Sequence, residues 1–239
     1  MWDSVPREAF AGVEIIAPGN LGYPPNAPLT KPASSTLEQD VRHVASFIPP
    51  DSRVHLFSHS YGGLVALQLV KALGARLGSA FLFEPVLFGA LTRSATSDAA
   101  ALAEAKSFAE SPSFFAEETG GDEAWLTAFI DYWNRPGSWA RMPEGARVAT
   151  RALSWKMFRE VREVFFDGSN FEDHVIRAPT TLVKAERSPA AARAMVDQLA
   201  RVNPGAVVKE LRGTGHMAPL THPKVLAEAV VEHWRRVWH

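Results

Sequence analysis

The stretch VHLFSHSYGG, residues 54–63, decides the fold of this chain. Its first four residues form a short apolar run that is typical of a buried strand. The helical pattern of Gly62–Leu73 follows almost at once. Ser60 therefore lies at a sharp turn from strand to helix, where a strained backbone holds the serine hydroxyl above the sheet. This turn predicts a nucleophilic serine.

The residues beside Ser60 suit such a turn. Ser58 and Gly62, two positions before and after it, are small, and we expect the strand and helix to approach closely there. The backbone N–H of Tyr61, at the start of the helix, is expected to face a developing oxyanion. Taken alone, the same residues also fit a serine that caps a helix in a glycine-containing turn.

Strand and helix patterns alternate outward from this turn. Strands are expected at Val13–Ala17, Val54–Phe57, Ala80–Phe83, Thr180–Lys184 and Ala206–Leu211. Helices are expected at Thr36–Phe47, Gly62–Leu73, Ala190–Val202 and His222–Trp238. Alternation with short connections predicts an α/β fold, a mostly parallel sheet with flanking helices.

Residues 88–170 differ from the rest of the chain because they show helical periods, no convincing strand and 13 of the 24 aromatic residues. We predict an inserted helical cap here, with residues 1–87 and 171–239 forming the core. Phe129, Trp133 and Trp139, together with Met217, are predicted to line a substrate pocket. The alternative for most of these aromatic residues is ordinary packing between helices.

Composition excludes several classes of protein. A net charge of −1 gives no electrostatic reason to expect nucleic acid or an anionic membrane as a partner. The absence of cysteine excludes disulfides, thiolate metal sites and a cysteine nucleophile. The sequence shows neither a signal peptide nor an apolar run of the roughly 20 residues that cross a membrane. We therefore expect a soluble cytoplasmic protein.

A serine nucleophile needs a base, and His216 is the best-placed histidine. It lies in GTGHMAP, residues 213–219, between the last expected strand and the final helix. Sites in open α/β sheets collect at this carboxyl edge. His59 is expected to pack or hydrogen-bond locally, whereas His233 and His239 are expected to face solvent.

The base in turn needs a carboxylate that orients it, and two candidates compete. Glu84 follows the strand after the serine, between three apolar residues and Pro85. Glu186 follows the strand Thr180–Lys184, where it also fits a surface ion pair with Arg187 or Lys184. We favour Glu84 because of its position at the sheet edge.

Together these residues resemble the α/β-hydrolase superfamily over most of the chain. The resemblance rests on the turn at Ser60, the order serine, acid, histidine, the Gly215–His216 loop and the helical insertion after Glu84. It implies that Ser60 is the nucleophile, that His216 is general base and then acid, and that the Tyr61 amide is an oxyanion donor. The chain looks most like small capped esterases, which use no cofactor.

The sequence departs from the family pattern in three ways. The usual acid position looks like Ser188, but some relatives place the acid where Glu84 stands. Ser58 replaces a common glycine. Ser60 lies close to Met1, so the N-terminal strands and the loop with the second oxyanion donor, roughly 40 residues, are expected to be absent. Either the start of the sequence is misassigned or trimmed, or the protein is a minimal variant with an incomplete oxyanion hole. An edge left uncovered in this way could support a homodimer.

The leading hypothesis is a serine hydrolase that cleaves an ester, thioester or lactone with an apolar part. The rival hypothesis, from another class, is a catalytically weak ligand-binding protein with the same fold. A carbon–carbon bond hydrolase or a cofactor-free haloperoxidase would use the same three residues. A dehalogenase is disfavoured because its nucleophile would be a carboxylate at position 60.

Overall fold

The computed structural model of the protein describes residues 2, 4–95 and 98–238. Within them a parallel sheet of four strands has the order β1-β2-β3-β4. The strands are β1 (Val54–His59), β2 (Leu77–Phe83), β3 (Thr180–Ala185) and β4 (Val207–Leu211). All neighbouring strands run parallel, so their carboxyl ends meet at one edge of the sheet. The predicted α/β class with a parallel sheet is confirmed.

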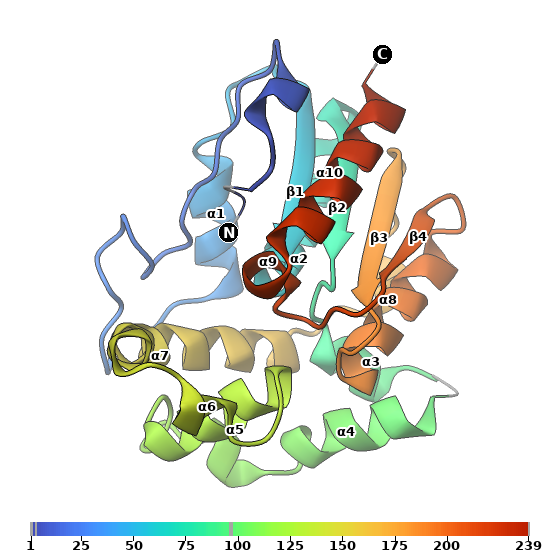
Figure 1. The fold of residues 1–239 in the computed structure, drawn as a ribbon. Coiled ribbons are helices and arrows are strands. Elements are labelled where there is room, and N and C mark those ends of the chain that lie inside the picture. The colour runs from blue at the N-terminus through green and yellow to red at the C-terminus, as the bar shows by residue number, and fades with distance from the viewer. Residues whose placement is uncertain (1, 3, 96–97, 239) are drawn as a thin grey trace.

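Helices cover both faces of this sheet (Figure 1). On one face lie α1 (Leu37–Ala45), α2 (Tyr61–Leu73) and α8 (Ala190–Val202), which share a core with Ala80 and Leu82 of β2. On the other face lies α10 (Pro223–Val237), preceded by the one-turn helix α9 (Ala218–Thr221), against Phe81 and Phe83. Successive side chains of β2 thus alternate between two cores, as the period of a strand requires.

A helical region, residues 88–170, connects β2 to β3. Its helices are α3 (Phe88–Arg93), α4 (Ala99–Ala109), η3 (Pro112–Phe115), α5 (Glu123–Trp133), α6 (Ser138–Arg141) and α7 (Glu144–Phe166). Figure 1 shows these helices across the end of the sheet toward which the arrows of β2 and β3 point. The region therefore covers the edge where the carboxyl ends of the strands meet. The short helix η4 (Phe171–Asp173) then leads back to β3.

The expected strand at Val13–Ala17 is wrong. These residues follow the short helix η1 (Arg7–Phe10) as irregular chain, and Ile15 and Ile16 are 50% and 40% exposed. A strand needs a neighbour for its backbone hydrogen bonds, and the only partner of β1 in the described sheet is β2. The β-branched residues alone do not supply such a neighbour.

The prediction that His233 faces solvent is also wrong, because the side chain is 2% exposed. His233 lies on the sheet-facing side of α10, next to Trp234. Its Nδ1 lies 2.7 Å from Thr181 Oγ1 and its Nε2 lies 3.0 Å from Ser79 Oγ. These two hydroxyl groups are the hydrogen-bond partners of the two imidazole nitrogens, which lie in the core. His239 lies outside the described residues.

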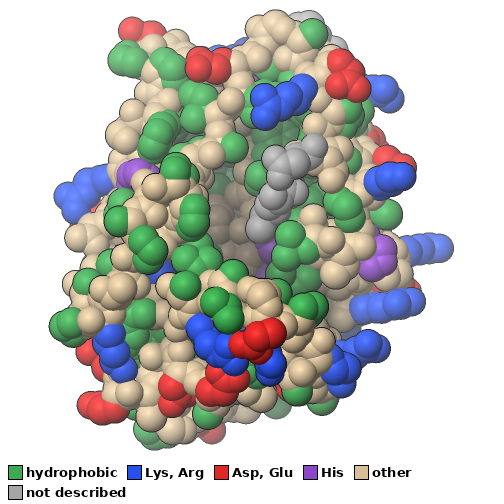
Figure 2. All heavy atoms as spheres, turned by 60° about the vertical axis from the view of Figure 1, so that its left-hand side comes forward, with side chains coloured by type: hydrophobic (Ala, Val, Ile, Leu, Met, Phe, Trp, Pro, Cys, Tyr) green, Lys and Arg blue, Asp and Glu red, His purple; other side chains and the backbone are tan. Residues whose placement is uncertain are grey.

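The surface carries charges of both signs. Figure 2 shows one face on which hydrophobic side chains surround a central hollow, with acidic and basic groups interspersed around it. Among the described residues, no helix combines the length and the apolar character that crossing a membrane requires.

Candidate active site

Ser60 occupies the sharp turn between β1 and α2 that its sequence predicts. Its backbone has φ 55° and ψ −127°, a conformation that residues other than glycine rarely adopt. The Ser60 N–H donates to the carbonyl of Phe83 at 3.1 Å, which ties the turn to the end of β2. The turn thus holds the side chain of Ser60 at the carboxyl edge of the sheet.

The close approach expected at Gly62 occurs at Gly63 instead. A Cβ atom at Gly63 would lie 2.4 Å from the Cβ of Pro85, whereas one at Gly62 would meet no atom within 4 Å. The residue that must be small is therefore the third after Ser60. Pro85 directly follows Glu84, so this contact brings the start of α2 against the end of β2.

Glu84 is completely buried, and both its carboxylate oxygens have hydrogen-bond partners. Its Oε1 accepts the backbone N–H of Ala185 at 2.7 Å, and its Oε2 accepts the hydroxyl of Ser188 at 2.9 Å. The same Oε2 lies 2.7 Å from His216 Nδ1. Ser188, which follows β3, thus supports the acid that follows the neighbouring strand β2.

Glu186, the alternative acid, lies elsewhere. Its exposed carboxylate accepts the backbone N–H of Gly213 at 2.6 Å and stabilises the loop before His216. The structure brings Glu84 to His216, so geometry favours Glu84 of the two candidates.

His216 joins Glu84 to Ser60 in one hydrogen-bonded chain. Its Nε2 lies 2.9 Å from Ser60 Oγ. A carboxylate only accepts hydrogen bonds, so Nδ1 carries the ring hydrogen and Nε2 is free to accept from the serine hydroxyl. This is the tautomer in which imidazole can remove a proton from serine.

Two aromatic rings hold the imidazole of His216 in place. The ring of Trp133, from α5, stacks on it with centroids 3.8 Å apart, and the ring of His59 lies at 4.6 Å. His59 also donates from Nε2 to the backbone carbonyl of His216 at 2.9 Å, so its hydrogen bond reaches a residue 157 positions away. Burial lowers the pKa of His59 well below its usual value, which keeps this ring neutral.

Both the backbone N–H and the side-chain hydroxyl of Tyr61 take part in the site and its support. As the first residue of α2 its N–H has no partner within the helix, so it is available to an anion near Ser60. Its hydroxyl donates to Asp40 Oδ2 at 2.7 Å. The first turn of α2 is therefore tied to α1 through a buried side chain.

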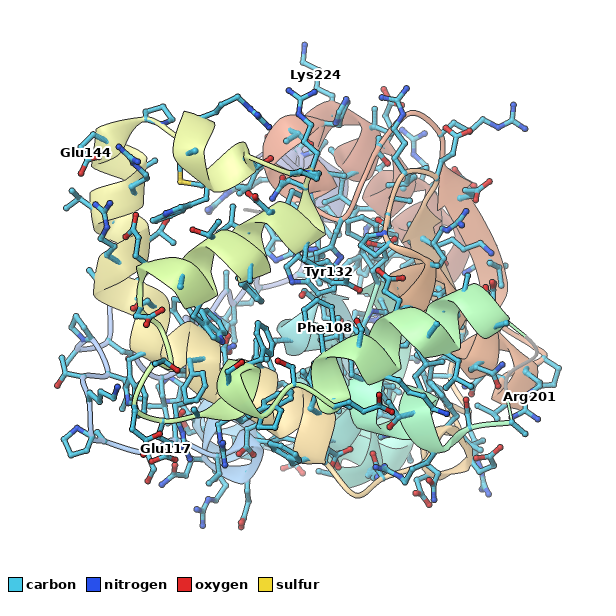
Figure 3. The ribbon with its side chains drawn as sticks, turned by 90° about the horizontal axis from the view of Figure 1, so that it is seen from below. Phe108, Glu117, Tyr132, Glu144, Arg201 and Lys224 are labelled. Carbon is cyan, nitrogen blue, oxygen red and sulfur yellow. The ribbon has the colours of Figure 1, made fainter. Side chains whose placement is uncertain are left out.

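A cavity of about 80 Å³ opens beside Ser60, between the sheet edge and the helical region. Figure 3 shows Phe108 of α4 and Tyr132 of α5 near each other in the middle of this region. Most of the wall is apolar or aromatic. The lining residues are Ser60, Tyr61, Val86, Phe88, Phe108, Phe114, Phe129, Tyr132, Trp133, Met157, Glu160, Val161, Val164 and Phe165.

Of the four predicted pocket residues, the structure places Phe129 and Trp133 on this wall, and Trp139 and Met217 elsewhere. The indole N–H of Trp139 donates to Glu123 at 2.8 Å, which fastens α6 to α5. The carbonyl of Met217 accepts the N–H groups of Leu220 and Thr221, so this residue opens α9. Aromatic or apolar character alone did not show which side of its helix each residue occupies.

A second group of buried polar residues was not predicted from the sequence. Lys156 of α7 is 1% exposed, and its Nζ donates to Asp40 Oδ2 at 2.5 Å and to Ser35 Oγ at 3.2 Å. Its Nζ also lies 3.5 Å from Glu160 Oε1. We call Asp40, Lys156, Glu160 and Tyr61 the interlayer cluster, because it joins α1 and α2 to α7. The signal that could have revealed it is a charged residue amid apolar neighbours, as in the stretch Ser154–Phe158.

The charges of this cluster depend strongly on burial. Burial, with the nearby Glu160 and Asp40, raises the pKa of Tyr61 far above its usual value. Burial also raises the pKa of Glu160 to about 7, although Lys156 and Tyr23 counteract part of this shift. Among the residues that the structure describes, no cluster of three or more histidine or acidic side chains could hold a metal ion.

Comparison with known proteins agrees with this fold. Residues 1–229 match the Alpha/beta hydrolase family, and the chain therefore belongs to that family. No curated protein matches the sequence significantly.

Solved structures with a similar fold include enzymes of several activities. An esterase from Thermogutta terrifontis has a TM-score of 0.67 and 17% identity, over 100% of this chain and 85% of that one. An enol-lactonase from Burkholderia xenovorans LB400 has a TM-score of 0.61 and 18% identity, over 90% and 78%. A meta-cleavage product hydrolase from Pseudomonas fluorescens IP01 has a TM-score of 0.64 and 17% identity, over 98% and 84%. At these identities the likeness concerns the fold.

Proposed function

We propose that this protein is a serine hydrolase that cleaves an ester, thioester or lactone with an apolar part. The observation that carries the proposal is the hydrogen-bonded chain from Ser60 Oγ through His216 to Glu84, with distances of 2.9 and 2.7 Å. Nucleophile, base and orienting acid are within hydrogen-bond reach of one another, as this chemistry requires. Ser60 also lies on the wall of the cavity, where a substrate carbonyl has room.

The proposed reaction proceeds through an acyl-enzyme. Ser60 Oγ attacks the carbonyl carbon while His216 Nε2 accepts the hydroxyl proton, and Glu84 stabilises the resulting imidazolium. The carbonyl oxygen becomes an oxyanion that the N–H of Tyr61 faces. His216 then gives its proton to the leaving alcohol or thiol. Water, activated by the same nitrogen, releases the acid and restores Ser60.

The cavity supports an apolar substrate. Its wall is built largely from aromatic and branched aliphatic side chains of α3, α4, α5 and α7. In this proposal the helical region acts as a cap that excludes water and selects the acyl or alcohol part. The esterase and enol-lactonase among the similar folds make ester and lactone carbonyls the first substrates to try.

The test is labelling with a fluorophosphonate probe followed by peptide mapping, together with hydrolysis of p-nitrophenyl esters of increasing chain length. Labelling at Ser60 and turnover that disappears in Ser60→Ala are the expected results. A folded protein that is neither labelled nor active would instead be the ligand-binding protein considered above. The cytoplasmic location and the homodimer stay predictions.

A further inference from the structure

The apolar cavity wall contains one acidic side chain among its described lining residues, Glu160 of α7. Its side chain is 12% exposed, and Ser60 and Tyr61 lie on the same wall. A carboxyl group is unfavourable in such surroundings unless it is hydrogen-bonded. Glu160 is therefore the feature of the cavity that apolar binding alone does not explain.

The two oxygens of Glu160 differ in their contacts. Oε2 accepts the hydroxyl of Tyr23 at 2.8 Å. Oε1 is buried and has no hydrogen-bond partner among the residues that the structure describes. The ammonium of Lys156 lies 3.5 Å away, and its two hydrogen bonds go to Asp40 and Ser35. Lys156 thus attracts Oε1 by charge, while this oxygen keeps the capacity for a hydrogen bond that no described residue makes within normal distance.

The protonation of Glu160 indicates which group fits best. Its pKa of about 7, raised chiefly by burial, means that ionised and neutral forms coexist near neutral pH. A hydroxyl group donates to the ionised form and accepts from the neutral form. An ammonium group can only donate, and a methyl group can do neither. A hydroxyl is therefore satisfied in both states of the site.

We propose that Glu160 is a specificity-determining residue that binds a hydroxyl group on the apolar chain of the substrate. The cavity then selects hydroxyalkyl esters or lactones over unsubstituted ones of the same length. This inference rests on the proposed hydrolase function, because it describes the chain attached to the carbonyl that Ser60 attacks.

A binding experiment without turnover tests the site first. Pairs of ketones that differ only by a terminal hydroxyl in place of a methyl, such as 6-hydroxyhexan-2-one and heptan-2-one, are added to the full chain over a series of lengths. The shift in melting temperature gives the relative affinity. At one length or more, we expect the hydroxyketone to bind the wild-type protein about tenfold more tightly, because its hydroxyl forms a hydrogen bond with Glu160. An apolar wall alone would favour the methyl compound instead.

Three variants connect this preference to Glu160. Glu160→Leu should reverse the preference, with a change in the affinity ratio of roughly tenfold or more. Glu160→Gln should retain most of it, because an amide both donates and accepts hydrogen bonds. Glu117→Leu is the matched control, since Glu117 is paired with Arg159 and lies at the outer edge of the view in Figure 3, away from Phe108 and Tyr132.

The kinetic counterpart is the ratio of kcat/KM for p-nitrophenyl hydroxyalkanoates and the matching alkanoates in the same proteins. If no ester is turned over but the ketone preference follows Glu160, the hydrolase proposal fails while the hydroxyl site stands. The hydroxyl site is wrong if the wild-type protein prefers the methyl compound at every length, or if the preference survives in Glu160→Leu. A stronger preference for an aminoketone that grows as pH rises would also overturn it, in favour of an ammonium site.

Discussion

Two buried polar networks meet at the start of α2, and they differ in how fully their atoms are paired. Along the sheet edge, Glu84 accepts hydrogen bonds from Ala185, Ser188 and His216, and His216 reaches Ser60. In the interlayer cluster, Lys156 and Asp40 pair closely, but one oxygen of Glu160 has no hydrogen-bond partner in the described part of the chain.

The difference reflects where each network is built. The first lies at the carboxyl ends of the four strands, with Ser60 after β1, Glu84 after β2, Ser188 after β3 and His216 after β4, so the hydrogen bonds of the sheet position its members. The second spans the helical region and the core, because Lys156 and Glu160 come from α7 whereas Asp40 comes from α1. The first network, whose atoms all have partners, suits chemistry that needs preorganised groups. The second, in which Oε1 of Glu160 has no hydrogen-bond partner, suits the binding of a ligand.

Loss of the nucleophile should separate activity from stability most strongly. Ser60→Ala should lower kcat for p-nitrophenyl esters by a factor on the order of 10⁶, and His216→Ala by a similar factor, because such residues act as a unit. The melting temperature of Ser60→Ala should stay close to that of the wild type, since the hydroxyl has only His216 as a described partner in its hydrogen bonds. A Ser60→Ala protein that still gives a burst of p-nitrophenol would refute the assignment.

Loss of the charge on the acid should have the next largest effect. Glu84→Gln should lower kcat by roughly 10⁴, because an amide next to Nδ1 no longer stabilises the required tautomer and the imidazolium. Glu186→Gln is the matched control and should change kcat little, since Glu186 contacts the loop at Gly213. Measured kcat values in the reverse order would transfer the role to Glu186.

Breaking the interlayer cluster should affect stability. Lys156→Met leaves the buried carboxylate of Asp40 without its cation, which should cost about 3–5 kcal/mol of the free energy of unfolding. The control is Lys184→Met, which removes a more exposed pair with Asp197 and should cost about 1 kcal/mol or less. Denaturant titrations of both variants give the comparison. Equal losses would show that burial does not distinguish the two pairs.

The pH dependence of stability should report the charge of Glu160. Its pKa is raised from 4.5 to about 7 in the folded state, so the folded protein binds more protons than the unfolded chain between these values. The contribution of Glu160 to the free energy of unfolding is therefore highest below pH 4.5. It falls by about 3 kcal/mol in total as the pH rises toward 7. Glu160→Gln should lack this fall.

Comparing wild type and Glu160→Gln across this pH range isolates the effect. Burial lowers the pKa of His174 and of His233 to about 4, so these residues contribute stability that increases with pH over much of the same range. Both proteins share them, and their contributions cancel in the difference. A difference in unfolding free energy that stays constant from pH 4.5 to 7 would contradict the raised pKa of Glu160.

Much of the candidate site could be predicted from local sequence because its parts are local. The strand–turn–helix at Ser60 depends on an apolar run, small residues after the serine and a helical pattern, all within 20 residues. The residue of close approach was expected at Gly62, and the structure places it at Gly63. The helix Ala190–Val202 was predicted with the bounds that the structure shows, since its apolar positions repeat at helical spacing. His216 was recognisable from its loop between the last strand and the final helix.

Tertiary structure alone decided features that depend on contacts between distant segments. Glu84 and Glu186 both follow predicted strands, and only the pairing of β2 with β3 and the path of the loop to His216 bring one of them to the imidazole. The Asp40–Lys156 pair joins residues 116 positions apart, beyond any local pattern. Val13–Ala17 has strand-like residues but lacks a neighbouring strand. Local preferences determine what a segment can form, whereas a hydrogen bond or an ion pair exists only when its second partner is brought within reach.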